Sequence, residues 1–431
     1  MNHRTARNLG VRGAARRRVQ TLSIAAIAVV CSFGLSLPGG CSARRVSAGS
    51  LPAPHPKPDD LTTLVHQLTG SSRSGRAAAR QALAKRKGDP RIMPLLVAVL
   101  RGKDYTARGH AAEALGKIGR PAIPPLIQAL IGDNSNVRGW AADALGDIGK
   151  PAVQPVIALL GQKSDIQYSA TQALRSIGSP AIPALVAALK DAGPRVRTGA
   201  AMALGEIGDA RAVNPLIAAF RRKRPGDERD EAQARGAAAV ALGELRAAPA
   251  AKLLLAALRD ENDAVRASAA EALGDFRLGA AVEPLIAALK DKAFGVRYDA
   301  AFALGKFADP RAIEPLGAVL TNKNEEEHVR WLAADALGKI NDRRAVPFLC
   351  AALQDPTLRG GCGFGALGAA AEAVGRMQDR RAVEPLIGLL DNGQMWAARA
   401  LGQIGTPAPS TPCFALLRAR TSECAARRCP R

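Results

Sequence analysis

Apolar and polar residues follow a helical pattern that returns about every thirty residues along most of the chain. In the stretch RGWAADALGDIGKPAVQPVIALL, residues 138–160, apolar residues recur at helical intervals on both sides of a Gly-Lys-Pro break. Closely similar stretches begin at Arg108 and at Ser169. The pattern predicts short amphipathic helices that are joined in pairs and repeated.

An apolar residue in an Ala-Leu-Gly-like motif marks the second helix of each pair, and we call it the anchor. The anchors are Leu83, Leu115, Leu145, Leu174, Leu204, Leu242, Leu273, Leu304, Leu337, Val374 and Leu401. One helix pair cannot bury its apolar face alone, so neighbouring pairs must stack. We therefore expect an all-α fold, a right-handed α-solenoid of about eleven helix pairs, over residues 59–405.

Local signals indicate where the two helices of a pair begin and end. Pro151 stands at the first position of one helix, where its missing N–H costs nothing. The other helix ends at Ile148-Gly149, where we expect glycine to adopt the left-handed cap conformation. A second proline recurs near the first turn, at Pro155, Pro183, Pro215, Pro284, Pro315, Pro347 and Pro385.

Composition agrees with closely packed helices and adds a basic charge. Apolar residues make up 48% of the chain but aromatic residues only 3%, so the core is built on Ala and Leu. The formal net charge is +22, and the two ends hold much of it. Residues 1–40 contain six Arg and no acid, and residues 406–431 contain five Arg and one Glu. The basic excess of the repeat region is therefore smaller than the total suggests.

The repeated units resemble HEAT repeats of the short type found in phycobilin lyases and in many bacterial proteins. The resemblance covers about four fifths of the chain. It implies a solenoid whose concave side binds other macromolecules, and it says little about which ones.

The first forty residues have the order of an export signal. Arg16-Arg17-Arg18 precedes an apolar run, residues 22–37, which is short for a membrane-spanning helix of about 20 residues. PGGCSA follows and resembles a bacterial lipoprotein signal, which implies that Cys41 carries a lipid. Cleavage after residues 46–48, or an uncleaved anchor, are the alternatives. We expect export to the cell envelope, the periplasm or the medium, with the membrane as a partner through this end.

Two further segments lie outside the repeats. Residues 41–58 contain Pro52, Pro54, Pro56 and Pro58 and are predicted to be an extended linker. Residues 406–431 form an irregular tail rich in Cys, Arg and Pro, where the repeat pattern stops.

An arginine recurs seven positions before the anchor, which places it on the core side of the second helix. The row comprises Arg108, Arg138, Arg197, Arg235, Arg266, Arg297 and Arg330. Acids precede it at Asp104, Asp133, Asp191, Asp230, Asp263 and Asp291. We interpret the row as a structural ladder of Asp–Arg pairs that ties repeat to repeat, and not as a nucleic-acid patch.

Positions two, five and six before the anchor point away from the core, toward the expected concave face. They hold all three tryptophans of the chain, two of its three tyrosines and one phenylalanine: Trp140, Trp331, Trp396, Tyr168, Tyr298 and Phe302. They also hold the acids Glu113, Asp143, Glu271 and Asp335. One interpretation is packing against the neighbouring repeat. The other is a binding groove for a protein or peptide partner, basic in character, because aromatic residues concentrate at interaction hot spots.

Catalytic chemistry finds little support in the sequence. Deoxyhypusine hydroxylase-like proteins share this fold and carry consecutive His-Glu pairs for iron, whereas none of the five histidines here precedes a Glu. We predict no cofactor, no metal site and no catalytic residue. An enzyme subunit of the lyase or hydroxylase type is the alternative to a binding scaffold. A nucleic-acid-binding solenoid is a third possibility, which the export signal and the acidic inner row oppose.

Overall fold

The structure, a computed structural model, describes residues 60–405 except 71, 87, 133, 191–192, 223–227, 359–364 and 391–393. The chain forms two units, residues 1–57 and 58–431, and every described residue belongs to the second. The predicted signal, Cys41, the linker and the tail lie outside the described residues.

The described residues form eleven pairs of α-helices, which confirms the predicted solenoid. The first helices of the pairs are α1 (Asp60–Thr69), α3 (Ile92–Arg101), α5 (Ile123–Ile131), α7 (Val153–Ile157), α9 (Ile182–Ala188), α11 (Val213–Arg221), α13 (Ala251–Ala257), α15 (Val282–Ala288), α17 (Ile313–Thr321), α19 (Val346–Gln354) and α21 (Val383–Leu390). The second helices are α2 (Arg73–Lys85), α4 (Tyr105–Ile118), α6 (Ser135–Ile148), α8 (Ser164–Ile177), α10 (Pro194–Ile207), α12 (Glu228–Glu244), α14 (Asp263–Phe276), α16 (Phe294–Phe307), α18 (Glu327–Ile340), α20 (Ala366–Met377) and α22 (Met395–Ile404).

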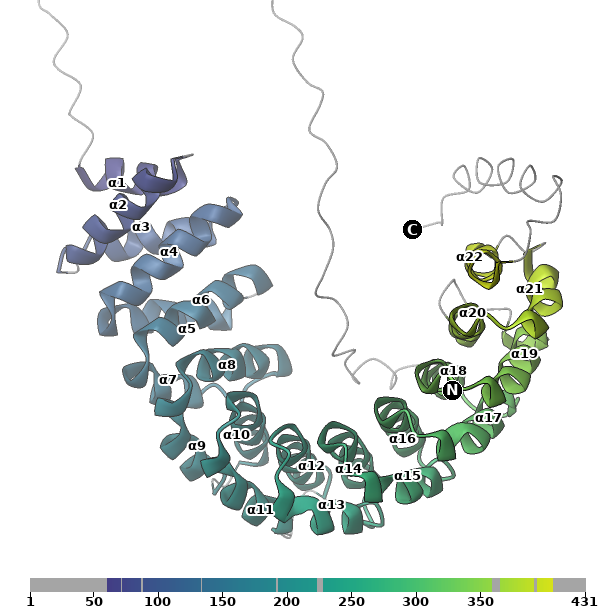
Figure 1. Ribbon diagram of the computed structural model, residues 1–431. Helices are drawn as coiled ribbons and strands as arrows, with labels where there is room; N and C mark the ends of the chain where they lie inside the picture. Colours follow the sequence, from purple (N-terminus) through teal and green to yellow (C-terminus); the bar gives the residue numbers. More distant parts are fainter. Residues whose placement is uncertain are drawn as a thin grey trace, which may run out of the picture. The chain divides into compact units, whose positions relative to one another are not determined.

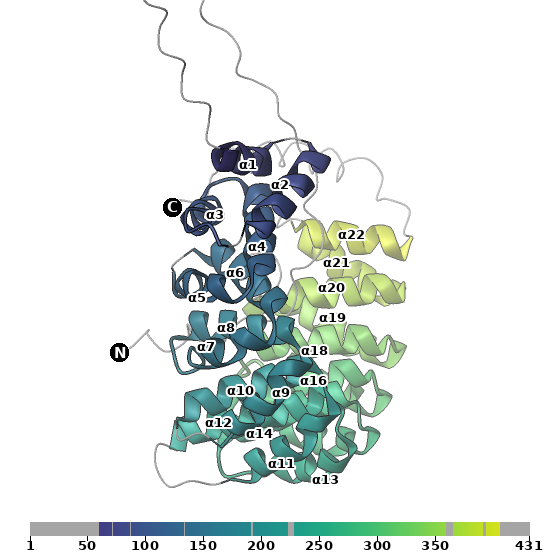
Figure 2. The same cartoon turned by 90° about the vertical axis from the view of Figure 1, so that its left-hand side faces the viewer.

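The helices of this unit stand in two layers along a curved path. From the second pair onward the even-numbered helices line the inner side and the odd-numbered helices the outer side (Figure 1). Figure 2 shows the pairs stacked one after another. Each inner helix contacts the inner helix of the next pair, from α4 with α6 to α20 with α22. The inner helices therefore form one continuous surface.

Short 3-10 helices lead into most of the outer helices. They span Arg120–Ala122, Lys150–Ala152, Ser179–Ala181, Ala210–Ala212, Ala248–Ala250, Gly279–Ala281, Pro310–Ala312, Arg343–Ala345 and Arg380–Ala382. One more, Pro356–Leu358, lies between α19 and the inner helix α20. Pro151 thus lies in a 3-10 turn, and the α-helix predicted to begin there starts at Val153. Pro155 remains in the first turn of α7, whose amides have no intrahelical carbonyl to bond.

The core lies between the two layers and is built from small and branched aliphatic side chains. All eleven anchors are buried, ten of them with no exposed surface. Alanines of the inner helices, such as Ala272 and Ala303, are equally buried. Small side chains at these positions let helix axes approach closely, which explains the low aromatic content.

The glycine that follows the anchor allows this close approach. A Cβ built on Gly243 would lie 2.5 Å from the Cα and the carbonyl oxygen of Ala272 on the next inner helix. At Gly274 the nearest atom, the Cβ of Ala303, would be 2.9 Å away. Atoms this close cannot coexist without a shift of the backbone, so the glycine is required by helix–helix contact and not by a turn.

The end of the inner helix differs in detail from the prediction. Gly149 has a positive φ of 75°, as expected, but its ψ of −138° is outside the left-handed helical region. The chain must pass from this residue directly into the 3-10 turn that contains Pro151. In the second half of the array, non-glycine residues such as Ala308, with φ 53° and ψ 36°, adopt the left-handed helical conformation instead.

Candidate functional site

The arginines of the ladder are held between consecutive repeats. Guanidinium groups donate hydrogen bonds to backbone carbonyls near the end of the outer helix of the same repeat: Arg108 to Gly102 at 2.6 Å, Arg138 to Gly132 at 2.7 Å, Arg235 to Phe220 at 3.1 Å, Arg266 to Asp260 at 2.8 Å, Arg297 to Asp291 at 2.9 Å and Arg330 to Leu320 at 2.8 Å. Several also pair with an acid of the next repeat: Arg138 with Asp165, Arg197 with Glu231, Arg235 with Asp260, Arg266 with Asp291, Arg297 with Glu325 and Arg330 with Asp355.

The acids that pair are mostly not those that the sequence analysis singled out. Asp291 does pair, bidentately, with Arg266 at 2.8 and 2.9 Å, and this ion pair lowers the pKa of Asp291. Asp104 instead caps α4 through the amides of Thr106 and Ala107. The reason is geometric, because most of these arginines reach forward to an acid in the loop or in the first turn of the inner helix of the next repeat. Asp133 and Asp191 lie outside the described residues.

Most of the predicted inner-face aromatics pack sideways onto neighbouring helices. Trp140 lies over Gly109 of the preceding inner helix, where a Cβ would be 3.0 Å from the ring. Its ring also meets that of Tyr105 edge-on, with centroids 5.4 Å apart. Tyr298, Phe302, Trp331 and Trp396 are likewise half-buried against the core. Tyr168 is exposed, at 45% of its surface. Packing therefore accounts for much of this set, and Tyr168 remains open to solvent.

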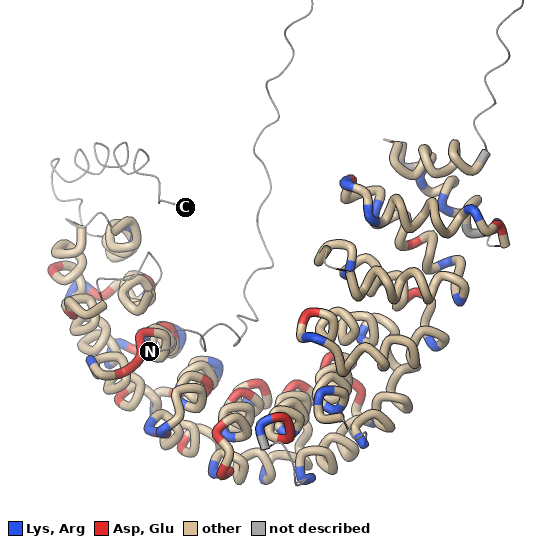
Figure 3. Tube along the Cα trace, turned by 180° about the vertical axis from the view of Figure 1, so that it is seen from behind, with Lys and Arg blue, Asp and Glu red and all other residues tan. Residues whose placement is uncertain are grey.

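The predicted inner-face acids are placed on α4, α6, α14 and α18, and two of them have basic neighbours one turn away. Glu113 pairs with Lys117 at 3.2 Å and with Arg80 of α2. Asp335 pairs with Lys339 at 2.6 Å. Asp143 is exposed and Glu271 is half-buried. Figure 3 shows Asp and Glu positions along the inner helices of the middle repeats.

A further set of inner-face residues, two positions after the anchor, was missed in the sequence analysis. We call it the seam row: Lys117, Asp147, Ser176, Glu206, Glu244, Asp275, Lys306, Lys339, Arg376 and Gln403. The same rotation of 100° per residue places these residues about 160° from the core, so the signal was present in the sequence.

Most seam-row side chains lie across the junction between their own helix and the one before. The Cδ atoms of Lys306 and Lys339 would be 3.5 and 3.6 Å from a Cβ on Gly274 and Gly305 of the preceding repeat. Likewise, a Cβ built on Gly338 would lie 2.6 Å from Nη2 of Arg376. The glycine that permits close helix contact therefore also brings these polar groups into one line.

Carboxylates gather where the seam row crosses the middle repeats. Burial, together with repulsion from Glu206, Asp275 and Glu271, raises the pKa of Glu244 to about 7. The Glu244 side chain still reaches solvent. Burial also raises the pKa of Asp299, to about 8, with a second contribution from Glu271. The inner face here is rich in carboxyl groups, and two of them change protonation near neutral pH.

A cation and an aromatic ring lie directly beside these carboxylates. Lys306 Nζ is 2.5 Å from Asp275 Oδ1 and 4.4 Å from the centroid of the Phe302 ring. Lys339 Nζ lies 5.8 Å from the same centroid. Phe302 thus has two ammonium groups near its ring, an arrangement that the ring's quadrupole favours.

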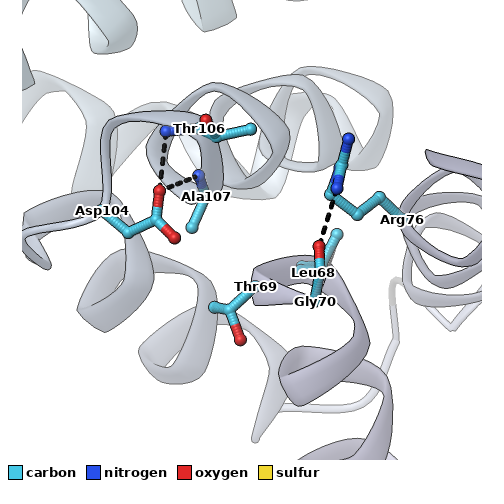
Figure 4. Close-up of a pocket in the computed structure, with 7 residues that line it drawn as sticks. All are labelled: Leu68, Thr69, Gly70, Arg76, Asp104, Thr106 and Ala107. Carbon is cyan, nitrogen blue, oxygen red and sulfur yellow. Dashed lines mark hydrogen bonds between the residues drawn. The ribbon is translucent and has the colours of Figure 1, made fainter. Parts of the chain in front are cut away.

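Two cavities of the described region do not add chemistry. One, of about 260 Å³, lies where α1 and α2 meet the start of α4 (Figure 4). Its polar groups serve the fold, since Asp104 caps α4 and Arg76 donates to the carbonyl of Gly70 at 2.7 Å. The other, of about 420 Å³, lies between the outer helices α13 and α15.

Two features are absent from the described residues. Among them, no group of His, Cys, Asp and Glu is arranged to hold a metal ion. None of the helices in this part of the chain is long and apolar enough to cross a membrane.

The stacked helix pairs with a buried arginine ladder define an α-solenoid of short repeats. Matches to the family of HEAT repeats cover residues 61–146, 104–175, 153–234, 227–301 and 282–360. The PBS lyase HEAT-like repeat matches residues 366–392. The chain belongs to the HEAT-repeat proteins.

Comparison with solved structures finds several similar chains. An engineered protein is 22% identical, with a TM-score of 0.29, over 81% of this chain and 99% of that one. Human deoxyhypusine hydroxylase in complex with glycerol is 22% identical, with a TM-score of 0.28, over 59% of this chain and 96% of the other. Kap95p, from a structure that concerns its binding to RanGDP, is 13% identical, with a TM-score of 0.47, over 85% and 59%. A comparison with curated proteins finds no match.

Proposed function

We propose that this protein is a non-catalytic scaffold that binds a protein or peptide partner on the inner face of its HEAT-repeat solenoid. The observation that carries the proposal is the continuous inner layer, in which acidic side chains and an exposed tyrosine lie on consecutive repeats. Exposed aromatic groups beside charges are typical of interaction hot spots. The excess of carboxylates in the middle repeats favours a partner segment that contains basic residues.

A site-specific crosslinking experiment tests which face binds. A photoreactive amino acid replaces Tyr168 on the inner helix α8, and in a second variant it replaces Gln154, exposed on the outer helix α7 of the same repeat. After illumination in cells, adducts are identified by mass spectrometry. We expect a defined adduct from the inner position and none from the outer one. Equal adducts at both positions, or none at either, would contradict inner-face binding.

We further propose that the protein is exported and held at the cell envelope by its N-terminal end. The support is the order of arginines, apolar run and Cys41 in the sequence. Whole-protein mass spectrometry on fractionated cells tests this. A form that begins at Cys41 with added acyl mass is the expected result, and an unprocessed chain in the cytosol would overturn it.

A further inference from the structure

The seam row carries its charges in two blocks. Three consecutive repeats contribute acids, Glu206, Glu244 and Asp275, and the next three contribute bases, Lys306, Lys339 and Arg376. The blocks meet at the ion pair between Lys306 and Asp275. All six side chains occupy the same position in their repeats, so one surface line changes from negative to positive at its middle.

We propose that the seam row from α10 to α20 binds an extended peptide segment that has a block of basic residues and a block of acidic residues. The basic block lies over α10, α12 and α14, and the acidic block lies over α16, α18 and α20. This inference rests on the proposed function and specifies its partner. A bipolar line can accept such a segment in one placement only, because the reversed placement opposes like charges.

The spacing of the repeats fits an extended chain. Packed helices lie about 10 Å apart, so six inner helices span roughly 50 Å. An extended peptide advances about 3.3 Å per residue, so every third residue meets a new repeat. A segment of about 16 residues therefore places three basic and three acidic residues opposite the six seam-row charges.

The internal ion pairs of the row leave it able to exchange partners. Glu206, 23% exposed, accepts a hydrogen bond from Gln172 at 2.8 Å and lies 3.6 Å from Arg175, which is 48% exposed. Lys339 pairs with Asp335 while 41% exposed. Ion pairs this exposed contribute little to stability, so an incoming charge replaces them at small cost. Their effect in the free protein is to hold the seam-row side chains along the line.

Two synthetic peptides of identical composition test the inference. Both have about 16 residues with Lys or Glu at every third position and Gly or Ser between. In the block peptide three Lys precede three Glu, and in the alternating peptide Lys and Glu take turns. Fluorescence anisotropy of the labelled peptides gives Kd for the full chain at low salt and at a pH well above 7, where Glu244 is ionised. We expect the block peptide to bind at least tenfold more tightly, and a high salt concentration to remove the difference.

Two double variants, both with unchanged net charge, provide a test of the seam row and a matched control. Glu244→Lys with Lys339→Glu interrupts both blocks of the seam row and should reduce the preference for the block peptide to less than threefold. Lys252→Glu with Glu314→Lys makes the same exchange on exposed positions of the outer helices α13 and α17, and should leave the preference intact. Circular dichroism verifies that both variants are folded.

The outcomes separate this inference from the function on which it depends. Equal affinity for the two peptides, or the same loss in both double variants, overturns the bipolar line even when the crosslinker at Tyr168 captures a partner. Failure of both peptides to bind also overturns it. A separate result would contradict the inner-face function itself: no crosslinked adduct from the photoreactive residue at Tyr168 or at Gln154.

Discussion

Replacing Gly243 by alanine tests whether close contact between inner helices holds the solenoid together. The added Cβ would lie 2.5 Å from two backbone atoms of Ala272, so neither helix can yield by moving a side chain. Alanine gains roughly 0.5–1 kcal/mol over glycine from helix propensity. Overpacking of a tight interface costs about 1–3 kcal/mol, and backbone contact places this site at the upper end. We expect a net loss of about 2 kcal/mol in the free energy of unfolding.

A series of glycines in the same chain provides the scale for this experiment. At Gly305 the new Cβ would be 3.2 Å from Ala336, a contact that a small shift relieves, so Gly305→Ala should be close to neutral. Gly139 lies exposed on α6 with no described atom within 4 Å, so Gly139→Ala should stabilise. Urea unfolding followed by circular dichroism gives the order. The reasoning is refuted if Gly243→Ala is as stable as Gly139→Ala.

Four further substitutions probe the ladder, an exposed ion pair as its control, a buried carboxyl and a helix cap. Arg330→Met leaves the buried Asp355 without its cation and should cost about 3–5 kcal/mol in urea unfolding. Arg344→Met, at an exposed pair, should leave the urea midpoint unchanged. Asp299 has a folded-state pKa of about 8 against an ordinary 3.8, so wild-type stability falls as pH rises between these values. Asp299→Asn should therefore match the wild type in unfolding measured near pH 4 and exceed it near pH 9, by on the order of 2 kcal/mol. Ala308→Gly relieves a left-handed conformation that is unfavourable for alanine. It should raise the free energy of unfolding by about 1 kcal/mol, which thermal unfolding shows as a higher midpoint temperature.

The fold was predictable because the same pattern of apolar residues, prolines and glycines recurs in repeat after repeat. A single Leu145 says little, but eleven anchors at similar spacing indicate a stacked array, and all of them are buried. The helix ends were less predictable. Gly149 and Ala308 serve the same purpose with different backbone conformations, because the residues that follow them differ.

The sequence predicts which side of each inner helix faces inward, but not which contacts the side chains on that side make. Rotation per residue placed Trp140 and Tyr168 on that side of their helices, yet Trp140 is covered by Tyr105 and Gly109 whereas Tyr168 is exposed. The difference depends on contacts with the neighbouring repeat, which the rotation per residue does not give. The partners of the ladder arginines were unpredictable for the same reason, since contacts between repeats depend on the stagger of neighbouring helices.

The same stagger links binding to stability in this solenoid. Because most seam-row side chains lie across the junction with the preceding inner helix, a peptide that contacts the row touches two helices at most steps. Such a ligand binds the stacked array and not the separated repeats, so it must stabilise the stack. At a concentration a hundredfold above its Kd the gain is about 2.7 kcal/mol. That is slightly more than the loss expected for Gly243→Ala, so a bound block peptide should restore the urea midpoint of this variant. The alternating peptide at the same concentration binds at least tenfold more weakly, gains at most about 1.4 kcal/mol and should restore the midpoint only in part.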